Sequence, residues 1–187
     1  MKTLEGLVWF AVALFMVHEF EEILLIKAWA IRYNDKIRSL WPKVKPFGLH
    51  LFDSAGYAAS PITETASIGI GIQFFLIALL TLLSVLFDSY LIWFGFMALT
   101  PFTSLFLHSR DVILFKGYTP GILTAVLTAI PTVWILCRVY ALSNFGIWET
   151  LIATVATNLV IGFLAFKFMH SSATALSMRL QAYANKK

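Results

Sequence analysis

The sequence predicts an all-α fold, a polytopic membrane bundle of about five transmembrane helices forming a single domain over residues 1–187. Hydrophobic residues make up 59% and charged residues 13% of the chain, and its mean hydropathy is +0.81. Long apolar runs carry this excess, and short connections without linkers or repeats separate them. So little polar surface is unable to coat a soluble globule, which indicates an integral membrane protein.

The apolar runs place the expected transmembrane helices at about residues 4–26, 61–87, 90–107, 120–140 and 147–168. Each run approaches or exceeds the roughly 20 apolar residues with which a helix crosses about 30 Å of hydrocarbon. The first run extends beyond the apolar stretch of a signal peptide and lacks a small-residue cleavage site, so we expect it to be a mature span.

Prolines mark several of the expected helix ends. Pro61 and Pro120 are expected to start helices, and Pro131 to kink one. Pro101 interrupts the third run, which ends at His108. The many Trp and Phe residues are expected at lipid-facing and interfacial positions.

Basic residues gather in the segments that share one side of a five-span bundle. These residues are Lys27, Arg32, Lys36, Arg38, Lys43, Lys45, Arg110, Lys116, Arg179, Lys186 and Lys187. The opposite side has only Lys2, Arg138 and the turn at Asp88. The positive-inside rule therefore predicts an N-terminus outside and a C-terminus in the cytoplasm, with residues 170–187 as a tail that can lie on the membrane surface.

The net charge of +4 is expected to anchor the protein to the cytoplasmic leaflet of a prokaryotic cytoplasmic membrane. Membrane lipid is accordingly the expected partner. A nucleic-acid partner is not expected, because the sequence offers no soluble basic face.

Ionisable residues interrupt the first apolar run at His18, Glu19, Glu21 and Glu22. Each such group costs on the order of 2.5–3.5 kcal/mol at the bilayer centre by insertion scales, so their presence predicts a functional site. At helical spacing His18, Glu21 and Glu22 share a face, whereas Glu19 is expected to face headgroups or a basic residue. Imidazole and carboxylate groups are ligands for divalent Zn, Fe or Mn, and the single Cys137 offers no thiolate site.

Further ligand candidates follow along the chain. His108 is the leading second histidine, with Asp111 one turn on. His50 and Asp53 form another pair at the same spacing in the first loop, and Glu64 opens the second span as a ligand or general base. In the predicted topology these residues lie toward one membrane face, which indicates a pocket open to the cytoplasmic leaflet.

Structural readings remain open for the same residues. His18, Glu21 and Glu22 could form an interhelical network with Lys27 or Arg110. For His50 and Asp53 an interfacial loop is the favoured reading, since Pro46, Gly48 and Gly56 indicate turns around them. Tyr118 belongs to a turn before the fourth span, from which its hydroxyl could reach a substrate or a metal-bound water.

The stretch His18-Glu19-Phe20-Glu21-Glu22 resembles the defining motif of the HXXEE family, a group of small, predicted integral membrane proteins of unknown function. That family is also associated with a further histidine and a Tyr-X-Pro-Gly sequence, which His108 and Tyr118-Thr119-Pro120-Gly121 resemble in kind and order. The resemblance covers about two thirds of the chain. It implies family positions at His18, Glu21, Glu22, His108, Tyr118, Pro120 and Gly121, and it implies no activity.

The first function class is a metal-dependent membrane enzyme. His18, Glu22 and His108 would hold a divalent ion, and Glu21 or Glu64 would act as general base on a lipid or amphipathic substrate. Hydrolysis is the simplest reaction. A non-haem iron oxidase or hydroxylase is a close variant, because the same ligand types suit iron.

The second function class is a cation or proton transporter, or a binding subunit, that uses the same intramembrane groups. The predicted gathering of polar residues on one side disfavours it. A water path that joined Asn158 to Glu22 would favour it, whereas the sequence shows no inverted repeat of the kind common in transporters.

Overall fold

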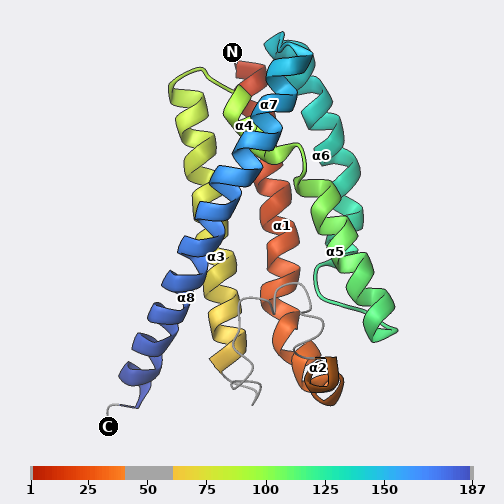
Figure 1. Ribbon diagram of the computed structural model, residues 1–187, viewed down its shortest axis with the longest axis vertical. Coiled ribbons are helices and arrows are strands. Elements are labelled where there is room, and N and C mark those ends of the chain that lie inside the picture. Colours follow the sequence, from red (N-terminus) through yellow and green to blue (C-terminus); the bar gives the residue numbers. More distant parts are fainter. Residues whose placement is uncertain (1, 41–60, 186–187) are drawn as a thin grey trace.

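The computed structural model describes residues 2–40 and 61–185, and every regular element in these segments is a helix (Figure 1). The elements are α1 (Lys2–Arg32), α2 (Asn34–Leu40), α3 (Pro61–Leu86), α4 (Leu91–Met97), α5 (Thr100–Phe115), α6 (Ile122–Ser143), α7 (Ile147–Thr157), a π-helical turn (Asn158–Gly162) and α8 (Phe163–Ala184). The predicted all-α fold is therefore confirmed for the described part of the chain.

The helix α1 runs through the middle of the bundle and packs against α3 and α6 (Figure 1). The other main pairs are α3 with α8, α4 with α7, and α5 with α6. The beginning of α1 and the end of α8 lie at opposite ends of the bundle. The turns α3–α4 and α6–α7 lie at the N-terminal end, whereas α2 lies at the other.

Among the described residues, three helical stretches are long and apolar enough to cross a membrane: Ser67–Leu86, Leu91–Phe115 and Ile122–Ser143. Ile147–Val160 is a shorter apolar helix. Large apolar side chains also point outward, such as those of Leu24, Phe106 and Ile130, which are at least 70% exposed. Exposed apolar surface on this scale is unfavourable in water and would be shielded by lipid, so these features suggest a membrane protein.

Several helix ends differ from the predicted ones. The third predicted span is two helices, since the chain turns at Ala98 and Leu99 and Pro101 lies in the first turn of α5, where its missing N–H is tolerated. The helix α5 continues to Phe115, so His108 lies within a helix rather than at its end. Pro120 precedes α6 by two residues instead of starting it.

Pro61 does start α3, and Pro131 lies inside α6. The helix α1 extends past residue 26 to Arg32, because residues 27–32 contain no proline or glycine that would end it. At the other terminus α8 continues to Ala184, so most of the predicted tail at 170–187 is helical.

The apolar core lies beside the N-terminal half of α1. It is formed by Val8, Ala11, Val12, Phe15, Ile77, Tyr90, Trp93, Phe94, Met97, Ile135, Leu136 and Val139. Trp93 is fully buried and its indole N–H donates to Thr81 Oγ1 at 2.9 Å, so this tryptophan is a core residue rather than part of an interfacial belt. Close packing of this kind holds membrane helices together, and here it fixes α1 at the level just before His18.

Candidate metal centre

The cluster begins on α1, where His18 and Glu22 point into the bundle from successive turns. Residues four apart share a helical face, and α1 contains no proline that would break their spacing. His18 is 3% exposed and Glu22 is 4% exposed. Two ionisable side chains are thus held side by side away from solvent.

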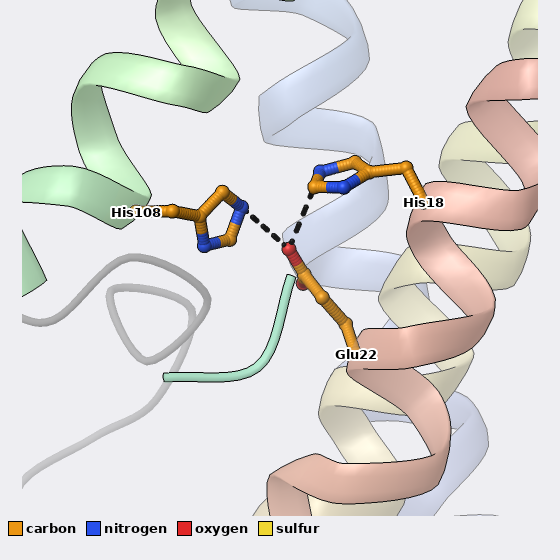
Figure 2. A group of neighbouring side chains, drawn as sticks. All are labelled: His18, Glu22 and His108. Atoms are coloured by element: carbon orange, nitrogen blue, oxygen red, sulfur yellow. Dashed lines mark ion pairs between the residues drawn. The ribbon is translucent and has the colours of Figure 1, made fainter. Parts of the chain in front are cut away.

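The third member comes from α5. His108 is buried, and its Nε2 lies 2.9 Å from Glu22 Oε1, while His18 Nε2 lies 3.7 Å from the same oxygen. Figure 2 shows this oxygen between the two imidazole rings, whose centroids are 5.0 Å apart. Residues separated by some ninety positions in the chain therefore meet at one point.

The geometry of these three side chains suits a divalent ion. One ligand atom from each residue lies within 4.8 Å of the others. Ligand bonds of about 2.0–2.2 Å in a tetrahedral zinc site place neighbouring ligand atoms about 3.3 Å apart, between the two measured separations. Two imidazoles and one carboxylate leave a coordination position open, which is the pattern of catalytic rather than structural sites. The group could therefore hold a metal ion.

Glu21, the other carboxylate of the motif, faces the first turn of α6. Its Oε2 accepts a hydrogen bond from the Thr124 backbone N–H at 2.7 Å and another from the Thr124 hydroxyl, and its Oε1 accepts one from the Tyr118 hydroxyl. The N-cap of α6 is Gly121, which has no side chain to cap the helix. Glu21 supplies the missing acceptor from α1, and a carboxylate is favoured at a helix N-terminus.

Hydrogen bonds hold the α5–α6 connection against the cluster. The Trp29 indole N–H donates to Tyr118 O at 3.0 Å, and the Thr119 hydroxyl donates to His108 O at 3.5 Å. Trp29 is thereby buried, in contrast to the lipid-facing position expected for tryptophans. Burial and the hydrogen bond to Glu21 raise the pKa of the Tyr118 phenol above its usual value, so Tyr118 stays a neutral donor.

Gly121 brings the α5–α6 connection close to the cluster. Its φ is +87°, and a Cβ built there would lie 2.5 Å from His108 Cε1 and 2.8 Å from Glu22 Oε1. Only glycine combines this backbone conformation with the absence of a side chain. The glycine of the Tyr-X-Pro-Gly sequence therefore forms one wall of the cluster.

Two small cavities adjoin the cluster. One, of about 20 Å³, is lined by His18 together with hydroxyl-bearing residues of α5 and α6 (Thr100, Ser104, Thr128 and Thr132) and apolar neighbours. The other, of about 10 Å³, is lined by Glu22, His108, Asp111 and Thr119 among others. Each has about the room of one water molecule. Asp111 is buried and accepts a hydrogen bond from Arg110 at 2.7 Å.

The other predicted site residues are not part of this geometry. His50 and Asp53 lie outside the described residues. Glu64 belongs to the first turn of α3, and its side chain lies outside the described part of the structure. Glu19 is buried at 6% exposure rather than facing headgroups.

Sequence reasoning missed Thr124, which contacts both His18 and Glu21. The available signal was its place three residues after Gly121, where a helix presents an N–H that requires an acceptor.

The fold and this cluster together define a helical-bundle protein with membrane-length helices and a buried group of two histidines and a glutamate. A family model for proteins of unknown function with an HXXEE motif matches residues 9–136. The chain belongs to this HXXEE family, as the motif predicted. The match includes all three residues of the cluster and the Tyr118–Gly121 connection. No curated protein and no solved structure matches the chain.

Proposed function

We propose that this protein is a metal-dependent membrane enzyme in which His18, Glu22 and His108 hold one divalent ion, Zn, Fe or Mn. The single observation that carries the proposal is the convergence of three buried ligand atoms within 4.8 Å of one another. Three ionisable groups are expensive to bury among apolar helices, and a shared cation offsets that cost. Hydrolysis is the simplest reaction for such a ligand set.

The chain's own residues divide the remaining tasks. When bound, the ion would lower the pKa of a water molecule and polarise a substrate oxygen. Asp111 lines the cavity shared by Glu22 and His108, which supports a role for its carboxylate as the base that would accept a proton from a water molecule there. Glu21 was a candidate base by sequence, but its bonds to Tyr118 and Thr124 favour a positioning role. Glu64 stays a prediction.

The proposed substrate is a lipid or another amphipathic molecule that enters from the cytoplasmic leaflet of a prokaryotic cytoplasmic membrane. In this topology α1, α3, α4–α5, α6 and α7–α8 are five crossings, with the N-terminus outside. The beginning of α1 and the end of α8 lie at opposite ends of the bundle, which supports an odd number of crossings. The contact of Gly121 with the cluster supports a site near the α5–α6 connection, which carries Lys116 and lies on the cytoplasmic side in the topology given by the positive-inside rule.

Two alternatives share this site. A non-haem iron oxidase or hydroxylase uses the same arrangement of two histidines and one carboxylate with open positions. A proton or cation transporter is supported by the four hydroxyl-bearing residues that line the larger of the two cavities, beside His18. Against transport, the Asn158 amide donates to Gly95 O and Thr154 O at 2.9 Å, so the residue needed to extend a path is bonded to neighbouring backbone.

The test is the metal content of detergent-purified protein, measured by inductively coupled plasma mass spectrometry. We expect about one equivalent of Zn, Fe or Mn per wild-type chain, and its loss in His18→Ala, Glu22→Gln and His108→Ala. Glu149→Gln is the matched control, because Glu149 is an exposed carboxylate that caps α7. Wild-type protein that binds none of these ions when they are supplied would refute the proposal.

The reaction class can be tested next. Zinc would direct assays to ester, amide and phosphoester hydrolysis, and iron to oxidation. Asp111→Asn should keep the metal and lose most turnover if Asp111 is the base, by about 10²–10⁴-fold. Proton or cation flux in proteoliposomes without any substrate turnover would instead support the transporter.

A further inference from the structure

Thr124 joins the two halves of the HXXEE motif. This half-buried residue lies in the first turn of α6, opposite α1. Its Oγ1 lies 3.2 Å from His18 Nδ1 and within hydrogen-bond distance of Glu21 Oε2. A single hydroxyl therefore stands between a proposed metal ligand and the carboxylate that caps α6.

The directions of these hydrogen bonds follow from the groups involved. A carboxylate can only accept, so the Thr124 hydroxyl proton is directed to Glu21. The Thr124 oxygen is then the acceptor for His18, which requires the proton of a neutral ring to be on Nδ1. The lone pair of His18 is consequently on Nε2, the nitrogen that faces Glu22 Oε1.

The backbone holds Thr124 in this position. Its N–H donates to Glu21 Oε2 at 2.7 Å, and its carbonyl accepts the Thr128 hydroxyl at 2.7 Å. The side chain is thus oriented by the helix N-terminus rather than by a flexible loop. This rigidity is what a group must have to set the orientation and tautomer of a neighbouring imidazole.

We propose that Thr124 is a positioning residue of the metal centre: its oxygen accepts a hydrogen bond from His18 Nδ1–H, its hydroxyl donates a hydrogen bond to Glu21, and His18 Nε2 is thereby presented to the metal. The inference rests on the proposed metal site. It also assigns a role to Glu21, which orients Thr124 without being a ligand. Metal-bound histidines commonly require such a partner on the second ring nitrogen.

The experiment compares Thr124→Val, which keeps the shape and removes the hydroxyl, with Thr124→Ser, which keeps the hydroxyl. Zn²⁺ affinity is measured by competition with a chromophoric chelator, and the visible absorption bands of the Co²⁺-loaded protein report ligand geometry. We expect Zn²⁺ binding to weaken by about 10–100-fold in Thr124→Val, with altered Co²⁺ bands, and to recover in Thr124→Ser.

Thr150→Val is the matched control, because it is the same substitution near the start of another helix, α7, where the Thr150 hydroxyl donates to Gly146 O at 2.8 Å and contacts no residue of the cluster among the described contacts. It should leave the affinity and the Co²⁺ bands unchanged. Unchanged affinity and bands in Thr124→Val would overturn the inference while wild-type binding still upheld the proposed function. A wild-type protein without Zn²⁺ affinity would overturn both.

A second measurement needs no folded variant of Thr124. Nuclear magnetic resonance of metal-free wild-type protein with ¹⁵N-labelled histidine reports the tautomer of each neutral ring, and His18→Ala assigns the His18 signals. The inference requires the proton of His18 on Nδ1. A proton on Nε2 would overturn it, whatever the metal content.

Discussion

The residues of the HXXEE motif have different environments although they lie within two turns of α1. His18 and Glu22 face His108, Glu21 faces the N-terminus of α6, and Glu19 is buried on another side of the helix. The helical period explains the division, since Glu21 is one residue, or about 100°, away from Glu22. Adjacent carboxylates can therefore serve a proposed ligand role and a helix-capping role at the same time.

Gly121→Ala should damage the cluster more than a glycine substitution elsewhere. A positive φ costs a non-glycine residue about 1–3 kcal/mol, and the new Cβ would clash with His108 and Glu22. We expect a lower melting temperature and a metal content below half of the wild-type value. Gly71→Ala is the control, since a Cβ at Gly71 in α3 meets nothing within 4 Å. Equal effects of the two substitutions would contradict the role given to Gly121.

Tyr118 should ionise later than a free tyrosine. Burial and the bond to Glu21 raise its pKa, so the folded protein favours the neutral phenol. The stabilising effect of this bond is fully present below pH 10, near the unfolded pKa, and is lost as the pH rises through the higher folded value. Alkaline titration of phenolate absorbance for wild type minus Tyr118→Phe should give a midpoint above 10. A midpoint at or below 10 would refute the Tyr118–Glu21 bond.

At the scale of elements, two close helix contacts have separate tasks. The first turn of α6 docks on α1 through Glu21 and brings Gly121 to the cluster. The contact of α4 with α7 is made possible by Gly95, where a Cβ would lie 2.8 Å from the backbone of Ala153, and Asn158 bonds to the same glycine. Small residues allow such approaches between membrane helices. The second contact contains none of the three clustered residues.

Substitutions in the α4–α7 contact should therefore reduce stability without removing metal. Gly95→Ala should lower the unfolding free energy by about 1–3 kcal/mol, because the added methyl meets rigid backbone. Asn158→Ala should cost less, since hydrogen bonds between membrane helices contribute about 0.6 kcal/mol on average. Thermal unfolding in detergent and metal content measure the two effects. Loss of metal from natively folded Gly95→Ala protein would contradict this separation.

At the scale of the whole molecule, the apolar core and the polar cluster occupy successive levels along α1. The core packs on residues 8–15 of α1, and the cluster uses residues 18–22. The apolar core can thus hold the helices together, while the level of the cluster contains ionisable side chains in place of apolar packing. Many outward-facing side chains of the described helices are large and apolar, which suggests a lipid environment.

The proposed five-crossing topology predicts on which side of the membrane each chain end and turn lies. Fusions of a reporter active only outside the cytoplasm should be active after Ser89 and after Asn144, and inactive after Lys116 and at the C-terminus. An epitope tag at the N-terminus should be accessible from outside intact cells. An N-terminal tag found on the cytoplasmic side would mean that α1 does not cross the membrane. An active C-terminal reporter would mean that α7–α8 does not cross it.

Much of the order of helices could be predicted from the sequence, because apolar runs long enough to cross a membrane nearly always form helices. The errors lie where a local signal was ambiguous. Pro101 interrupts an apolar run predicted as one span, and the run is divided there into α4 and α5, with Pro101 in the first turn of α5. As tryptophans of an apolar chain, Trp29 and Trp93 are expected in an interfacial belt. Both are instead buried, and the indole N–H of each donates a hydrogen bond.

For the candidate site, the sequence by itself determined that His18 and Glu22 share a helical face and that His108 and the Tyr118–Gly121 segment are family positions, because helical spacing and short motifs are local properties. Only the tertiary structure decided that His108 meets Glu22 and that Glu21 faces the first turn of α6. It also decided that Thr124 lies between His18 and Glu21. These contacts join residues about ninety or more positions apart in the chain. Their geometry depends on the packing of α1, α5 and α6, which no local pattern encodes.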